Sequence, residues 1–203
     1  MKKLILLLSL SLTFCSSFGQ QNIKEDEKIS KSVMGFLKWY KSIGATGNQP
    51  PKQARPKYSI VKDIPINKNY KRQVIDKAGV EKYLDFYRKS GFLSEEYLNG
   101  LRSYFNGINN NLIKRAPIKK NDMIKIDGLD RDIQLQTFEP EIILDNLDKA
   151  VVTKSLVVYD KALISVNFYE EVNLIFTLTK HKDVWLIDYL GPDNTSLKSF
   201  FRQ

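Results

Sequence analysis

Residues 172–180 read VNLIFTLTK, and the alternation in this stretch decides the fold. Its apolar side chains stand at every second position, at Val172, Leu174, Phe176 and Leu178. Most residues between them are polar, with Ile175 the exception. A period of two residues predicts a β-strand with one face against a core and the other face partly polar.

Three more stretches of this kind surround it, at residues 156–159, 163–169 and 184–190. Only short polar turns separate the four stretches, so we expect them to be consecutive strands of an antiparallel meander. In the last stretch Trp185 alternates with Ile187 and Tyr189. This spacing predicts that all three side chains lie in the core.

The chain before the meander has helical periodicity instead. Residues 29–40 carry apolar side chains at helical spacing, and Gly44 is expected to end that helix. Asp76 is the expected N-cap of a second helix that ends near Gly91. Ser94 is the expected N-cap of a third helix. The inner stripe of this third helix is Leu98, Leu101, Phe105, Ile108 and Leu112.

Helices followed by a meander indicate the α+β class, with N-terminal helices packed on an antiparallel sheet. Residues 44–73 begin with several glycines and prolines, which predict a loop inserted in a single domain over residues 20–203. A short strand at residues 58–61 is expected within that insertion.

The start of the chain has the features of a targeting segment. A cationic start precedes an apolar run at residues 4–12, which is too short to span a bilayer. Ser17 and Gly19 are small enough for signal cleavage, so we expect residues 1–19 to be a signal peptide. The chain would then be exported, periplasmic or secreted, with no transmembrane helix in its mature form. A lipoprotein anchored through Cys15 is the alternative, which the bulky phenyl ring just before that cysteine disfavours.

Positive charge gathers in the first half of the chain. Residues 20–126 hold 22 Lys or Arg and 10 Asp or Glu, whereas residues 127–203 hold 8 and 13. For an exported chain this charge favours an acidic envelope component, such as a phospholipid head group, as partner. The sequence has no motif typical of nucleic-acid binding, so nucleic acid is not expected. The alternative is that the lysines simply solvate the surface.

Three stretches carry a resemblance to a known family: FLKWY at 36–40, FLSEEYLNGL at 92–101 and KDVWLIDYL at 182–190. Together they resemble the nuclear transport factor two-like superfamily, and within it exported bacterial domains of unknown function. The resemblance covers most of the chain after residue 19. It implies a cone in which a curved sheet wraps around helices and leaves a pocket. The superfamily contains isomerases and dehydratases as well as proteins that only bind or assemble, so the fold alone does not fix the function.

The expected pocket lies between the helix that contains residues 36–40 and the meander. Trp39 falls off the main apolar stripe of that helix. With Tyr40, Tyr83 and Tyr87 it is the candidate to contact a small amphipathic ligand. We therefore expect a non-enzymatic binding or interaction module, with no cofactor. One alternative is a module that docks an acidic protein partner through its sheet face or residues 44–72.

A basic cluster is the best local candidate for contact with an anion. It consists of Lys114, Arg115, Lys119 and Lys120. Lysine and arginine side chains pair with phosphate or carboxylate groups, and salt weakens such contacts. The alternative is that this cluster is a solvated connector between the helices and the sheet.

A further alternative is an isomerase- or dehydratase-like enzyme with a buried aspartate as its acid–base group. The candidates are Asp127, Asp130 and Asp132, with Asp122 nearby, and Tyr40, Tyr83 or Tyr87 as the donor. These aspartates would otherwise make turns around Gly128. No metal site is expected, because His181 is the only histidine and Cys15 the only cysteine.

Overall fold

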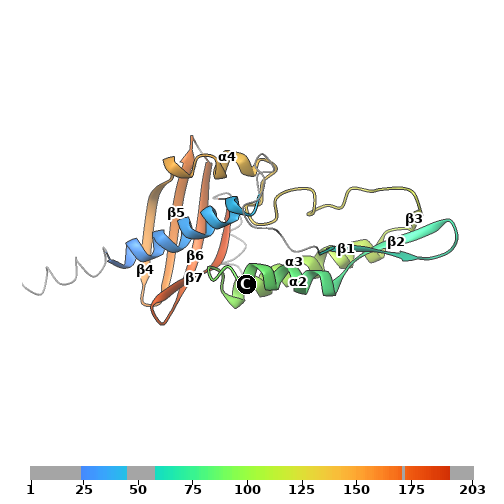
Figure 1. The fold of residues 1–203 in the computed structure, drawn as a ribbon, viewed down its shortest axis with the longest axis horizontal. Helices are drawn as coiled ribbons and strands as arrows, with labels where there is room; N and C mark the ends of the chain where they lie inside the picture. The colour runs from blue at the N-terminus through green and yellow to red at the C-terminus, as the bar shows by residue number, and fades with distance from the viewer. Residues whose placement is uncertain (1–23, 45–57, 171, 193–203) are drawn as a thin grey trace, which may run out of the picture.

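The structure is a computed structural model that describes residues 24–44, 58–170 and 172–192. Two antiparallel sheets are connected by helices (Figure 1). One sheet has four strands in the order β4-β5-β6-β7, and the other has three strands in the order β1-β2-β3. The fold is therefore of the α+β class, as the sequence predicted. The expected signal peptide at residues 1–19, with Cys15, lies outside the described residues.

The four-stranded sheet is the predicted meander. Its strands are β4 (Val151–Val158), β5 (Lys161–Tyr169), β6 (Val172–His181) and β7 (Val184–Pro192). Each strand pairs antiparallel with the next one along the chain. β4 starts at Val151, earlier than predicted. Its first residues could not be recognised as strand, because nearly all residues of β4 are exposed and leave no alternating pattern in the sequence.

A bulge in β7 reverses the alternation of its side chains. The β6–β7 ladder pairs Thr177 with Tyr189. It then pairs the next residue of β6 with Ile187, which leaves Asp188 as an extra residue. Leu190 is therefore buried in place of Tyr189. The prediction that Tyr189 lies in the core was wrong for this reason.

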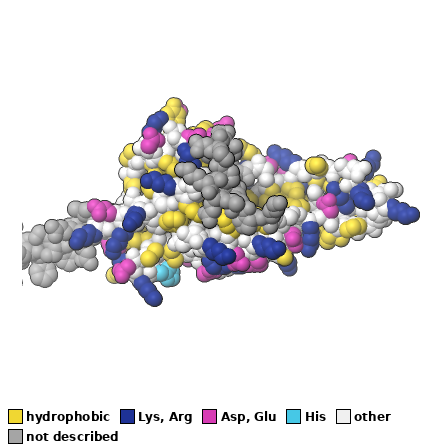
Figure 2. Space-filling view, in the orientation of Figure 1, with side chains coloured by type: hydrophobic (Ala, Val, Ile, Leu, Met, Phe, Trp, Pro, Cys, Tyr) yellow, Lys and Arg dark blue, Asp and Glu magenta, His cyan; other side chains and the backbone are white. Residues whose placement is uncertain are grey.

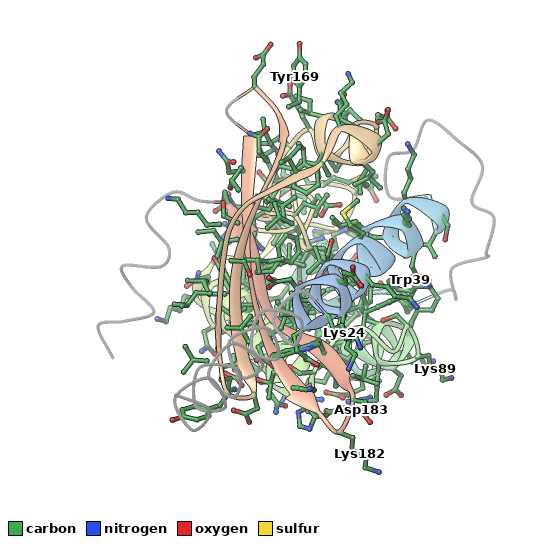
Figure 3. The ribbon with its side chains drawn as sticks, turned by 90° about the vertical axis from the view of Figure 1, so that its left-hand side faces the viewer. Lys24, Trp39, Lys89, Tyr169, Lys182 and Asp183 are labelled. Carbon is green, nitrogen blue, oxygen red and sulfur yellow. The ribbon has the colours of Figure 1, made fainter. Side chains whose placement is uncertain are left out.

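A helix over residues 24–42, here named the first helix, lies on the same side of this sheet as the short helix α4 (Pro140–Leu144) (Figure 3). A 3-10 turn, η1 (Leu147–Lys149), connects α4 to β4. The predicted inner face of the first helix is buried at Ile29, Val33, Phe36, Leu37 and Tyr40. These side chains share one core cluster with the meander.

Two antiparallel helices, α2 (Lys77–Arg88) and α3 (Glu95–Lys114), connect the two sheets. The hydroxyl of Ser94 accepts a hydrogen bond from the N–H of Tyr97 at 3.1 Å and caps α3 as predicted. Asp76 is the N-cap of α2, although its side chain makes no cap hydrogen bond. All five residues of the predicted inner stripe of α3 are buried.

The backbone between α2 and α3 joins the outer edge of β7. The N–H of Ile187 donates to the carbonyl of Phe92 at 2.8 Å, and the N–H of Ser94 donates to the carbonyl of Ile187 at 2.9 Å. Leu93 and Ile187 thus form an isolated parallel bridge. The connection holds the start of α3 beside β7.

The three-stranded sheet forms an arm at one end of the molecule (Figure 1). β1 (Val61–Pro65) and β2 (Tyr70–Ile75) make a hairpin, and β3 (Ile118–Lys119) pairs with β2. The sequence predicted mostly loop over residues 44–73. The short strand expected at residues 58–61 overlaps β1 only at Val61, and the hairpin escaped detection because β1 is almost wholly exposed and carries no buried alternating face. The rest of that prediction, residues 45–57, lies outside the described residues.

Among the residues that the structure describes, no helix combines the length and the apolar character needed to cross a bilayer.

Candidate functional site

A cleft of about 620 Å³ opens between α3, β7 and the segment at residues 131–136, and we name it the α3–β7 cleft. Apolar and aromatic side chains form most of its wall: Tyr97, Leu101, Tyr104, Ile133, Tyr189 and Leu190. Its charged lining residues are Glu96, Arg131 and Asp188. A concave, largely apolar space with a few charged groups is typical of a small-molecule site.

A smaller groove of about 280 Å³ continues from the cleft over the sheet. The groove and the cleft share Glu96, Asp188 and Tyr189, so the two spaces adjoin. Leu156 and Leu163 give the groove an apolar floor. A ligand longer than the cleft could therefore extend onto the sheet.

Helix α3 provides one wall of the cleft. Glu96 and Tyr104 both line it, and eight residues of α-helix separate them by about 12 Å along the axis. Gly100 lies between them and is exposed. A Cβ built on Gly100 would have no atom within 4 Å, so the cleft is open above this turn.

The bulge in β7 provides the opposite wall. Because Asp188 is the extra residue, Asp188 and Tyr189 both reach the cleft. The carboxylate of Asp188 accepts a hydrogen bond from the hydroxyl of Thr179, and the Nζ atom of Lys161 lies 3.7 Å from it. Its charge is therefore balanced from within the sheet.

The irregular segment at residues 131–136 provides the third wall of the cleft, and side chains of neighbouring elements hold it in place. The phenol of Tyr104 donates to the carbonyl of Gly128 at 2.6 Å. Gly128 has a φ of 88°, a backbone conformation that favours glycine. Arg131 follows three residues later and also lines the cleft. In the described part of the chain, Arg131 and Glu96 have no ion-pair partner.

A buried hydrogen-bond network lies behind this segment. Gln134, only 1% exposed, accepts a hydrogen bond from the phenol of Tyr97 and donates one to the phenol oxygen of Tyr83. Burial, reinforced by the nearby phenol of Tyr87, raises the pKa of Tyr83 and Tyr97 well above the usual tyrosine range. Both phenols therefore stay neutral and fix the segment in place.

The four aromatic residues predicted to contact a ligand meet in the core, between the first helix and α2. The ring of Tyr87 lies 5.5 Å from that of Trp39, 6.2 Å from that of Tyr40 and 4.6 Å from that of Tyr83. The three tyrosines are buried, and Trp39 packs against Phe86. None of the four is among the described residues that line the α3–β7 cleft. Their role as ligand contacts stays a prediction.

Asp132 is the candidate aspartate that the fold brings to a candidate tyrosine. Its Oδ2 accepts a hydrogen bond from the phenol of Tyr40 at 2.6 Å, and its Oδ1 accepts one from the N–H of Leu135 at 2.7 Å. Burial is the main cause that raises the pKa of Tyr40, and the Asp132 carboxylate adds to it. Oδ2 of Asp132 thus ties the segment at residues 131–136 to the first helix, while Oδ1 holds the turn within the segment.

The other candidate aspartates lie in ion pairs or turns near the surface. Asp127 pairs with Arg115 at 2.8 Å, and Asp130 pairs with Lys125 at 2.8 Å. The hydrogen bond from Lys125 lowers the pKa of Asp130. Asp122 is exposed in the turn after β3, where its N–H donates to the carbonyl of Lys119.

The predicted basic cluster lies where α3 ends and β3 begins. Arg115 is its one member with an ion pair among the described residues. Lys114, Lys119 and Lys120 are exposed, and the described part of the chain offers them no carboxylate partner. The structure thus places three cations without an ion pair in the described residues along the arm, from the end of α3 to the chain that leaves β3.

The described residues contain no group of three or more His, Cys, Asp or Glu side chains placed to hold a metal ion.

No family model, curated protein or solved structure matches this chain. The resemblance to the nuclear transport factor two-like superfamily therefore stays a prediction.

Proposed function

We propose that this protein is an exported binding module whose α3–β7 cleft takes one small amphipathic ligand. The observation that carries the proposal is the cleft itself, about 620 Å³ in volume, with an apolar and aromatic wall and an arginine free of ion pairs among the described residues. A cavity of this size holds a drug-sized molecule.

The charges in the cleft favour one orientation of the ligand. Glu96 stands at the end that adjoins the groove, and its carboxylate, which has no ion pair among the described residues, would repel an acidic group. Arg131 belongs to the cleft but not to the groove. An acidic head group therefore sits at Arg131, and the apolar body of the ligand lies against Leu101 and Leu190.

Binding fits the lining of this cleft better than acid–base catalysis does. A catalytic acid or base would be a titratable group with a shifted pKa that faces the cleft. Tyr97 has such a shift, but its phenol is already engaged with Gln134. Asp132 is not among the described residues that line the cleft. The hydrogen bonds of Tyr97 and Asp132 therefore serve to hold the wall of the cleft in place.

The first test blocks the cleft and follows the binding of a fluorescent fatty acid with a dansyl group. Gly100→Phe places a ring in the open space above α3, and Gly107→Phe places the same ring on an exposed turn of the same helix. We expect Gly100→Phe to weaken binding at least about tenfold and Gly107→Phe to leave it unchanged. Equal affinity of the two variants, or no binding to the unmodified protein, would contradict the proposal.

The second test asks what Arg131 recognises. Arg131→Gln should weaken binding of the dansyl fatty acid about tenfold while leaving the matching dansyl alcohol unaffected, since only the acid gains a charged hydrogen bond. A parallel loss for both probes would show that Arg131 merely supports the wall. Native mass spectrometry of protein from its own cell envelope would then identify the natural ligand by its mass.

A further inference from the structure

The arm is independent of the cleft and has a surface that the proposed function does not use. Its β1–β2 turn is fixed by Asn67, whose Oδ1 accepts hydrogen bonds from the N–H groups of Asn69 and Tyr70 at 2.9 Å each. The N–H of Lys120 donates to the carbonyl of Asn69 at 2.9 Å. The chain that leaves β3 therefore runs beside this turn, and the two together form the tip of the arm.

One face of the arm combines cations with exposed apolar side chains. Ile64 pairs with Arg72 across β1 and β2. Tyr70 pairs with Lys119 across β2 and β3. Directly paired residues, and residues two apart on a strand, share a face of the sheet. These four residues therefore lie on one face, which we name the basic face, and Ile64 and Tyr70 there are 42% and 40% exposed.

Asp63, the acidic residue of the β1–β2 hairpin, lies on the opposite face of the sheet. Asp63 is next to Ile64 along β1, so its side chain points the other way. There it forms an ion pair with Lys71 at 2.9 Å. The strand positions of the basic face thus carry positive charge without a carboxylate among them.

The tip adds further apolar and cationic groups. Ile66 is 47% exposed at the turn, and Met123 is 95% exposed in the chain after β3. Lys68 and Lys120 are also exposed there, with no ion pair in the described residues. Figure 2 shows Lys and Arg side chains around this end of the molecule with hydrophobic atoms between them. Residues 61–75 and 114–125 together hold nine Lys or Arg against two Asp.

We infer that the arm docks on a bilayer that contains anionic phospholipid. Lysines near such a surface are attracted to the head groups, while isoleucine, methionine and tyrosine side chains between them enter the head-group region. Tyrosine suits this depth because its ring is apolar and its hydroxyl is polar. The basic face and the tip provide both kinds of group together.

The shape of the arm favours a lipid surface over an acidic protein. The outer strands of a three-stranded sheet lie only about 10 Å apart. A stable protein interface buries about 800 Å² on each partner, with a continuous apolar centre. A narrow tip with separate apolar side chains does not provide such a centre, but it can insert between lipid head groups.

Vesicle co-flotation tests this inference, with phosphatidylcholine vesicles that contain or lack phosphatidylglycerol. We expect the protein to float with the anionic vesicles, to bind the neutral ones much less, and to be released as salt rises. Every variant carries the same residues 1–23, so any vesicle binding by that segment cancels in the comparison. Absence of binding, or equal binding to both kinds of vesicle, would overturn the inference.

Matched variants assign the binding to the arm. Lys68→Glu with Lys119→Glu should weaken binding to the anionic vesicles at least about tenfold. The control, Lys82→Glu with Lys154→Glu, changes the net charge equally at exposed positions away from the arm, and it should have little effect. Equal losses in both double variants would show that only the total charge matters and would overturn the assignment to the arm.

The apolar contribution has its own pair of variants. Ile66→Ser removes an exposed side chain from the tip, and Val184→Ser removes one that is 55% exposed at the start of β7. We expect about a fivefold loss for Ile66→Ser alone. The lipid inference is wrong if Ile66→Ser binds the vesicles as well as Val184→Ser does and if a polyglutamate column also retains the protein. The partner would then be an acidic polymer.

Failure of the arm variants leaves the cleft proposal untouched, because the dansyl probes report on the cleft separately.

Discussion

The carboxylate of Glu25 helps to hold the start of the first helix to the sheet. Oε2 of Glu25 accepts a hydrogen bond from the indole N–H of Trp185 at 2.9 Å and pairs with Nζ of Lys180 at 2.9 Å. Lys28 pairs with Oε1 of Glu25 at 3.1 Å. The hydrogen bond from Lys180 is the main cause that lowers the pKa of Glu25 from 4.5 to about 2. Ionised Glu25 therefore contributes to folding.

This pKa makes stability depend on pH in a defined window. Because the folded pKa of Glu25 is depressed, its contribution is present above pH 4.5 and is lost as the pH falls through about 2. Glu25→Gln should lower the free energy of unfolding at pH 7 by about 1–2 kcal/mol, since the group lies near the surface and solvent screens it. The difference from the unmodified protein should vanish near pH 2. Urea unfolding at a series of pH values measures this.

The control for this prediction is Glu27→Gln. Glu27 is an exposed carboxylate of the same helical turn, with no ion pair among the described residues. It should change the unfolding midpoint little at any pH. An equal effect of the two substitutions would show that net charge, rather than the contacts of Glu25, sets the pH dependence.

At the scale of elements, the sequence predicts those that bury one continuous face. α3 shows this, because its N-cap Ser94 and its inner stripe both follow from residue spacing and both are present. β1 could not be found in this way, since nearly all of its side chains are exposed and the strand depends on pairing with β2. Regular structure without a buried face leaves little trace in the residue pattern.

The α3–β7 cleft could not be predicted for a related reason. Its charged residues come from a bulge at Asp188 and from irregular backbone around Arg131. A bulge changes which side chains share a face, and nothing in the spacing of residues 184–190 marks where it falls. The aromatic cluster around Tyr87 was predictable as a set, but its position in the core depends on how the first helix meets α2.

The cap of α3 gives a prediction at this scale. Ser94→Ala removes the hydroxyl that accepts the N–H of Tyr97 and leaves that buried donor without its partner. We expect the free energy of unfolding to fall by about 1 kcal/mol. Ser103→Ala, on an exposed position of the same helix, should change it by much less. Chemical denaturation of both variants measures the difference, and equal midpoints would mean that the cap contributes nothing.

At the scale of the whole molecule, the helices and the meander share one core and a backbone joint. The core cluster includes residues of the first helix, α2, α3 and the meander. The joint consists of the hydrogen bonds of Ile187 with Phe92 and Ser94. Neither the helices nor the meander can unfold without exposing apolar side chains of the other, so unfolding should be cooperative.

Tryptophan fluorescence can test this cooperativity. Trp39 packs against α2 and reports on the helices, whereas Trp185 lies on β7 and reports on the meander. Trp39→Phe and Trp185→Phe each leave one reporter. We expect both variants to show a single transition in fluorescence that coincides with the transition in far-ultraviolet circular dichroism. Two separate transitions in either variant would show that the halves unfold independently.

The contacts between the first helix and β7 also determine when the core can form as the chain is synthesised. Ser32 in the first helix donates to the carbonyl of Trp185 at 2.5 Å, so two of the most distant described parts of the chain meet. Chains emerge from the ribosome starting with their N-terminus. The buried face of the first helix must therefore wait, uncovered, until β7 has been made. Until then this chain stays open to whatever binds unfolded apolar segments, and its core can close only once β7 is in place.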